Sequence, residues 1–120
     1  MLSVNKLSVN ELIDRRDELD GKPVEVCGLL TFEFENTLIQ HFPKAEQRQT
    51  DADTALPCCP SSVWLAFGSG SIRPNDDVLS RWNGKRVRIT GVVRNAREPF
   101  GCGHFSAWNC EIQPFTIERM

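Results

Sequence analysis

The chain contains one pattern twice, and this self-match constrains the fold more than any other feature. LDGKPVEVCGLL at residues 19–30 and WNGKRVRITGVV at residues 82–93 both place Gly-Lys before a run in which apolar and polar residues alternate. A period of two is that of a β-strand with one buried face. Each run also has a glycine in its middle, Gly28 or Gly91, where small barrels bend or bulge. We therefore expect two similar strands with corners at these glycines.

Weaker signals predict the other elements. Ser8 with Glu11 three residues later is a capping-box pattern and predicts a helix over residues 8–19. In the last strand, Cys110, Ile112, Phe115 and Ile117 are expected on the inner face, and Pro114 is expected to force an irregularity. The alternation predicts strands over residues 24–34, 37–42, 61–67, 85–94 and 108–118, a short helix that ends at Trp82, and an insertion loop over 43–61.

This order of elements resembles the five-stranded oligonucleotide/oligosaccharide-binding (OB) fold, with a short helix between strands three and four. The Gly-Lys-x-Val-x-Val-x-Gly pattern and Gly-His-Phe-x-x-Trp at residues 103–108 are similar to small bacterial OB proteins of uncharacterised function, of the stress-tolerance and tRNA-anticodon-like type. The resemblance implies a mainly β fold without naming a ligand. We expect an N-terminal helical extension over residues 1–20 and an OB-type barrel over residues 21–118.

The cysteines and the N-terminus indicate a compartment. Five cysteines are an odd number, scattered unlike the disulfide framework of a small secreted domain. No apolar run approaches the roughly 20 residues that cross a bilayer, and the N-terminus has no hydrophobic signal core. These features predict a cytoplasmic protein with reduced thiols and no membrane association.

The net charge of −2 conceals a basic C-terminal part. Residues 1–80 carry 7 Lys and Arg against 13 Asp and Glu, whereas residues 81–120 carry 7 against 3. Arginines concentrated on one strand and the following loop are typical of a local anion-binding face.

A candidate nucleic-acid site follows from these residues. Trp64 should face outward on the third strand, where OB barrels usually bind ligands, and an outward ring can stack on a base. The predicted site consists of Arg86, Arg88, Arg94 and Arg97, with Trp64 and Phe105 as stacking rings. The alternatives are that Trp64 packs under the N-terminal helix or the insertion loop, and that the aromatic loop closes the end of the barrel.

Other functions have less support in the sequence. An accessory or inhibitor protein is the main alternative, in which the acidic loop 43–61 contacts a protein partner. Zinc binding by Cys58, Cys59, Cys102 and His104 has the right ligand types, but adjacent cysteines lack the usual spacing of zinc ligands.

Nothing in the sequence indicates catalysis. The chain lacks a phosphate-binding glycine loop, a nucleophile elbow and a helical His-Glu metal motif. Cys102 and His104 could be drawn as a nucleophile and its base, but the neighbouring glycines make an extended segment doubtful. We therefore predict a non-catalytic binding module that needs no cofactor.

Overall fold

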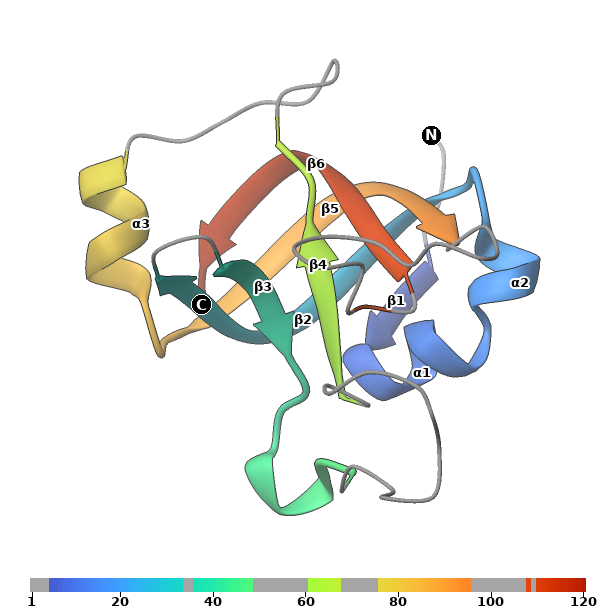
Figure 1. Cartoon of the computed structure of the whole chain (residues 1–120), viewed down its shortest axis with the longest axis horizontal. Helices are drawn as coiled ribbons and strands as arrows, with labels where there is room; N and C mark the ends of the chain where they lie inside the picture. Colours follow the sequence, from blue (N-terminus) through green and yellow to red (C-terminus); the bar gives the residue numbers. More distant parts are fainter. Residues whose placement is uncertain (1–4, 34–35, 49–60, 68–75, 96–107, 109) are drawn as a thin grey trace.

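The computed structural model describes residues 5–33, 36–48, 61–67, 76–95, 108 and 110–120. Figure 1 shows their strands wrapped into a barrel. The order in the sheet is β1-β2-β3-β4-β6-β5, and pairing between β2 and β5 closes the ring. The strands are β1 (Asn5–Ser8), β2 (Pro23–Glu33), β3 (Asn36–Gln40), β4 (Ser62–Leu65), β5 (Arg86–Asn95) and β6 (Cys110–Arg119). The predicted five-stranded barrel is confirmed as β2 to β6, and β1 adds a parallel strand on the edge of β2 that the sequence did not predict.

The N-terminal helix begins as predicted and then breaks. Ser8 and Glu11 form the full capping box at the start of α1 (Val9–Asp14). A separate helix α2 (Arg16–Leu19) follows, because Arg15 between them leaves helical geometry at φ −105° and ψ 15°. The single helix over 8–19 was therefore wrong. The break lets α1 pack on β1, β2 and β4 while α2 packs on β5.

The remaining helices lie outside the barrel wall. Lys44–Glu46 forms a single 3-10 turn after β3, and α3 (Asp76–Trp82) precedes β5 as predicted. Within the part of the chain that the structure describes, no helix is long and apolar enough to cross a membrane. The core fills the inside of the barrel, and α1, α2 and α3 each add buried apolar side chains to it.

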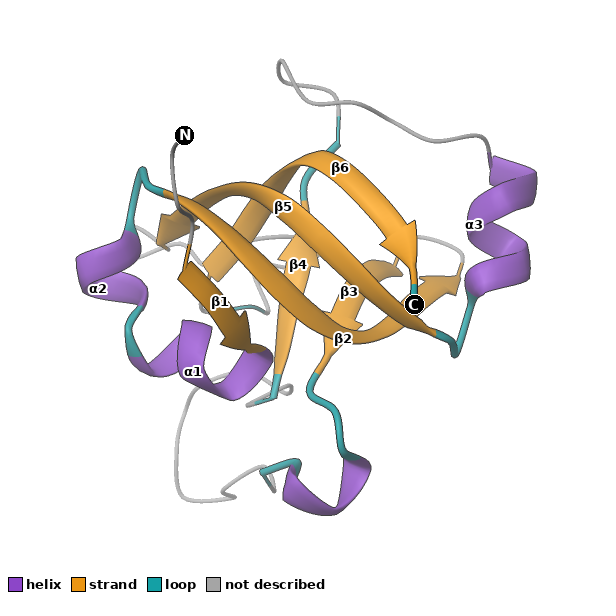
Figure 2. Cartoon of the chain, turned by 180° about the vertical axis from the view of Figure 1, so that it is seen from behind, coloured by secondary structure: helices purple, strands orange, loops and turns teal. Residues whose placement is uncertain are grey.

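The two copies of the self-match lie side by side as an antiparallel pair (Figure 2). Val26 pairs with Ile89, the residue at the equivalent position of the other copy. Gly21 and Gly84 have φ angles of 79° and 80°, and each donates its N–H over 2.7 Å to the last carbonyl of the other copy. The pair therefore has a local two-fold axis between Val26 and Ile89, and α2 and α3 lie at opposite ends of the ribbon.

Gly28 and Gly91 are points of close backbone contact. A Cβ at Gly28 would lie 2.4 Å from the carbonyl oxygen of Gln40 on β3, and one at Gly91 would lie 2.3 Å from that of Gln113 on β6. Only glycine permits this approach. The predicted irregularity is confirmed at Gly91, where the register of the β5–β6 pair shifts, whereas a corner at Gly28 stays a prediction. The two glutamines stand in similar short sequences, Gln40 in Ile-Gln-His-Phe and Gln113 in Ile-Gln-Pro-Phe. The internal repeat therefore extends beyond the two segments of the self-match.

The irregularity predicted at Pro114 is a bulge. Thr90 pairs with Thr116 and Gly91 with Pro114, so that Phe115 lies between two pairs without a partner. The Phe115 ring is 46% exposed. Its predicted inward position was wrong, because the extra residue of a bulge shifts the alternation of the strand.

We predict that Gly28→Ala and Gly91→Ala each lower the free energy of unfolding by about 1–3 kcal/mol, because the added methyl group meets backbone that cannot move aside. Urea denaturation followed by circular dichroism measures this change. Thr90→Ala, which removes atoms next to Gly91 on the outer face, is the control and should cost much less. Wild-type stability in both glycine variants would contradict the close-contact interpretation.

Candidate functional site

The arginines of β5 lie on its outer face, as the alternation predicted, but they differ in surroundings. Val87, Ile89 and Val93 are fully buried on the inner face. Arg88 donates to a carboxylate oxygen of Glu118 over 2.9 Å and lies 4.0 Å from Glu25. The hydrogen bond to Glu118 and its charge raise the pKa of the Arg88 guanidinium. The charge of Arg88 is therefore largely compensated.

Trp64 lies away from the start of β5. It pairs with Glu111 on β6, which in turn pairs with Arg94 at the far end of β5. The half-buried Trp64 ring tilts by 48° against the buried Trp108, with 4.9 Å between centroids, and Trp108 Nε1 donates to Ser62 Oγ over 2.9 Å.

The predicted nucleic-acid residues are therefore divided between two places. Arg86 and Arg94 are separated by about 26 Å of strand at 3.3 Å per residue. Trp64 lies near Arg94 at the end of β5, whereas Arg86 and Arg88 lie near the start of this strand. Arg97 and Phe105 lie outside the described residues, as do Cys58, Cys59, Cys102 and His104 of the zinc alternative. Among the residues that are described, no cluster of side chains could hold a metal ion.

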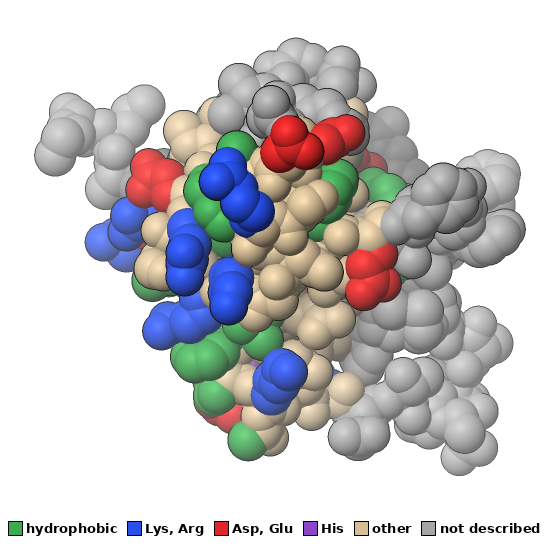
Figure 3. All heavy atoms as spheres, turned by 90° about the vertical axis from the view of Figure 1, so that its left-hand side faces the viewer, with side chains coloured by type: hydrophobic (Ala, Val, Ile, Leu, Met, Phe, Trp, Pro, Cys, Tyr) green, Lys and Arg blue, Asp and Glu red, His purple; other side chains and the backbone are tan. Residues whose placement is uncertain are grey.

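A group of exposed cations lies where α3 ends, β5 begins and β6 ends. Figure 3 shows Lys and Arg side chains gathered on this side of the molecule. We call the group the basic end and define it as Arg81, Lys85, Arg86 and Arg119, all of them exposed. The backbones of these strand ends are neighbours, because Met120 N–H donates to the Arg86 carbonyl over 3.0 Å and Arg119 pairs with Val87. Within the described residues, no carboxylate pairs with these four cations, in contrast to Arg88.

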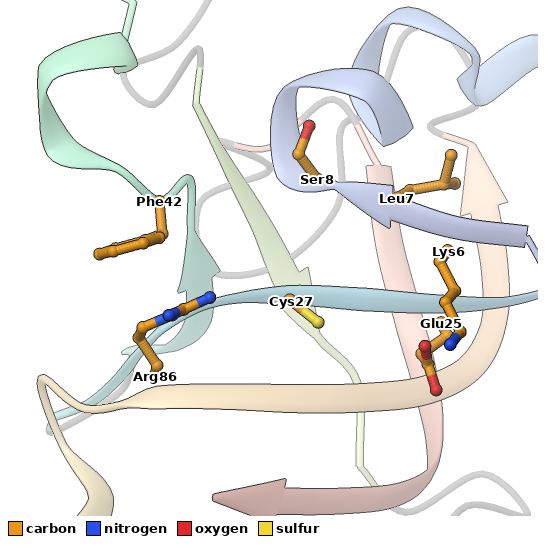
Figure 4. A pocket seen from close by; sticks show the side chains of 7 residues that line it. All are labelled: Lys6, Leu7, Ser8, Glu25, Cys27, Phe42 and Arg86. Atoms are coloured by element: carbon orange, nitrogen blue, oxygen red, sulfur yellow. The ribbon is translucent and has the colours of Figure 1, made fainter. Parts of the chain in front are cut away.

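A notch in the outer surface adjoins the basic end. The edge of β2 changes partner here, because Ser8 ends β1 opposite Cys27 while β3 pairs from Leu29 onward. The opening has a volume of about 230 Å³ (Figure 4). We call it the Cys27 notch, which is lined by Lys6, Leu7, Ser8, Glu25, Cys27, Phe42 and Arg86.

An aromatic–cation pair forms one rim of the Cys27 notch. The Arg86 guanidinium carbon lies 4.1 Å from the centre of the Phe42 ring, and Phe42 is 38% exposed. Figure 4 shows Lys6 and Glu25 at the opposite rim with Cys27 between them. Sequence reasoning missed Phe42 and Lys6. The repeated Ile-Gln-x-Phe was the available signal for Phe42, whereas nothing marked Lys6.

Polar contacts hold Phe42 in place through its neighbours. His41 is buried, and its Nδ1 accepts the Asn10 N–H over 3.2 Å. Gln47 donates to the His41 carbonyl over 2.9 Å, and the Arg48 guanidinium donates to both carboxylate oxygens of Asp14 over 2.8 and 2.7 Å. The segment after β3 is thus tied to α1 on both sides of Phe42.

The surroundings of the Cys27 thiol disfavour its ionised form. Burial raises the pKa of the Cys27 thiol, and the carboxylate of Glu25 adds to this, while Arg88, Arg86 and Lys6 oppose it. A thiol with a raised pKa is mostly protonated at neutral pH and reacts slowly. In space, Cys27 lies between the two rims and forms the floor of the notch.

The topology and the surface define a class of protein, an OB-type barrel with a strand and two short helices added before it. In sequence, no protein-family model and no curated protein matches the chain. In structure, the chain is similar to an asparaginyl-tRNA synthetase from Pyrococcus horikoshii complexed with asparaginyl-adenylate, with a TM-score of 0.51 and 14% identity. The match covers 98% of this chain and 23% of the synthetase, so the chain spans about a quarter of that protein.

A second similar structure is a small binding protein. OBody AM3L09, bound to hen egg-white lysozyme, has a TM-score of 0.53 and 16% identity, over 98% of this chain and 97% of that one. A chain assigned as an aspartyl-tRNA synthetase from Leishmania major Friedlin has a TM-score of 0.50 and 13% identity, over 99% of this chain and 21% of that one. At such identities, the likeness establishes the OB-type fold alone.

We predict that the Asp14–Arg48 pair makes stability depend on pH. The hydrogen bond from Arg48 lowers the pKa of the Asp14 carboxyl below its usual 3.8, so the unfolded chain takes up this proton more readily than the folded one. The stabilisation is present above about pH 4 and is lost as the pH falls through the lowered pKa. Because the pair is exposed, Asp14→Asn should cost about 0.5 kcal/mol at neutral pH, and this cost should disappear as the pH falls through the lowered pKa.

Urea denaturation at a series of pH values tests this expectation. Glu33→Gln, which removes an exposed carboxylate that has no partner among the described residues, is the control. An Asp14→Asn curve parallel to that of the wild type would show that the pair contributes no pH dependence.

Proposed function

We propose that the chain is a non-catalytic OB module that binds single-stranded nucleic acid, and that the basic end forms the main contact with the phosphate backbone. The observation that carries the proposal is that the exposed cations Arg81, Lys85, Arg86 and Arg119 have no carboxylate partner among the described residues, and that one of them lies over the exposed ring of Phe42. Cations attract a phosphate backbone, and exposed aromatic rings stack on unpaired bases. A folded duplex offers no such bases at its outside, which favours a single strand.

The proposal keeps part of the predicted site and changes its centre. Arg86 remains, whereas Arg88 is compensated by Glu118 and contributes less. Trp64 and Arg94 lie further along the barrel, where a longer nucleic-acid strand could also contact them. The role of Arg97 and Phe105 stays a prediction, because they lie outside the described residues.

The two-fold repeat supplies a matched pair of variants. Lys22 and Lys85 occupy equivalent positions of the two Gly-Lys turns, and both are exposed, yet they lie at opposite ends of the barrel. We predict that Lys85→Glu weakens binding to a labelled single-stranded oligonucleotide about tenfold at low salt, or about 1.4 kcal/mol. Lys22→Glu changes the total charge by the same amount and should have a much smaller effect.

Fluorescence anisotropy over a range of salt concentrations provides the measurement. Each lost phosphate contact should reduce the slope of log K against log salt by about 0.7 for a single strand. Equal losses for Lys22→Glu and Lys85→Glu would mean that only net charge matters. No binding by the wild type at low salt would refute the proposal and leave a protein partner as the alternative.

A charge-gain variant tests the compensation of Arg88. Glu118→Gln removes the carboxylate that accepts from Arg88, so the guanidinium becomes available to a phosphate. We predict tighter binding by roughly threefold at low salt, with a steeper salt dependence. Glu33→Gln again serves as the control, and an equal gain in both variants would contradict a local effect at Arg88.

A further inference from the structure

We propose that the Cys27 notch holds one nucleotide of the bound strand, with its base against the Arg86–Phe42 pair and its phosphate between Lys6 and Arg86. This inference rests on the proposed function and names a subsite for it. The notch is continuous with the basic end, because Arg86 belongs to both.

The charge of the notch favours an anion. Lys6 and Arg86 line it from opposite rims, and neither has a carboxylate within ion-pair distance among the described residues. Glu25 is the one carboxylate in the lining, and it lies 4.0 Å from Arg88 outside the notch. The lining therefore has one more positive than negative charge.

The shape and the remaining chemistry favour a planar group joined to that anion. The Arg86 guanidinium lies over the Phe42 ring, and both guanidinium and aromatic planes stack on bases. The volume of about 230 Å³ is below the roughly 300–1,000 Å³ of sites for drug-sized ligands. One nucleotide joins an anion to a flat ring within a small volume.

Glu25 gives the notch a preference among bases. Its carboxylate only accepts hydrogen bonds. Because its side chain is 16% exposed, a ligand can approach the carboxylate from few directions. Cytosine presents an amino group to such an acceptor, whereas thymine presents a carbonyl oxygen in the same place. We therefore expect tighter binding of oligo(dC) than of oligo(dT) of equal length.

A pair of filling variants isolates the notch. Cys27→Leu places a larger side chain on its floor without a change in charge. Thr116→Leu is the control for added side-chain volume, because Thr116 is exposed on β6 and does not line the notch. The two-fold equivalent of Cys27, Thr90, pairs directly with Glu25 and is therefore too close to the notch to serve. Thermal denaturation of both variants checks that each remains folded, and Phe42→Ala removes the exposed ring as a second, independent variant.

Anisotropy titrations with oligo(dC) and oligo(dT) then separate the two proposals. The wild type should bind oligo(dC) about threefold to tenfold more tightly, and Cys27→Leu and Phe42→Ala should remove this preference with the salt slope unchanged. Thr116→Leu should keep the preference, and Glu25→Gln should lose it. Binding of both strands with equal affinity, or an unchanged preference in Cys27→Leu, would overturn the notch and leave the basic end intact. Binding of neither would refute the proposed function itself.

Thiol labelling gives a readout that does not depend on affinity differences. In a variant with Cys58, Cys59 and Cys102 changed to serine, Cys110 is fully buried and Cys27 is the accessible thiol. At a pH high enough to ionise part of this thiol, saturating oligo(dC) should slow maleimide labelling of Cys27 several-fold. An unchanged labelling rate under saturating binding would show that the strand does not enter the notch.

Discussion

The close approach of backbones at Gly28 and Gly91 is the contact on which the barrel depends. At these two points the backbones of β3 and β6 approach β2 and β5 so closely that there is no room for a side chain. The two contacts lie on the long strands β2 and β5, whose pairing closes the sheet into a ring. They also fix the registers, and so decide which side chains enter the core and which face outward.

The framework is repeated, but its outer surface is not. Gly21 and Gly84 have the same positive φ in both halves, and Gly28 and Gly91 each lie against the carbonyl oxygen of a glutamine. At equivalent outward positions the residues differ, and Cys27 corresponds to Thr90. Among the described residues, a strand like β1 lies beside the first half alone, and the second half has no equivalent of the notch there. Backbone packing demands the repeated glycines, whereas the surface between them is free to acquire a binding site.

The fold could be predicted from the sequence to the extent that its signals are local. Alternation located the strands, the capping box located the start of α1, and the self-match identified β2 and β5 as equivalents. The break at Arg15, the parallel strand β1 and the outward turn of Phe115 were missed. Each of them depends on what an element packs against: α1 and α2 follow different parts of a curved surface, and the bulge at Phe115 belongs to a pairing with β5.

By itself, the sequence determined the OB-type barrel, its two mid-strand glycines and the outward direction of the β5 arginines, because periodicity and glycine placement act within one segment. Only the tertiary structure decided which of those arginines keeps an available charge. Glu118 compensates Arg88 from a neighbouring strand, while Arg86 lies over Phe42 in the segment that follows β3. Such cross-strand partners come from distant parts of the chain, and their meeting is set by the register of the closed sheet rather than by any local pattern.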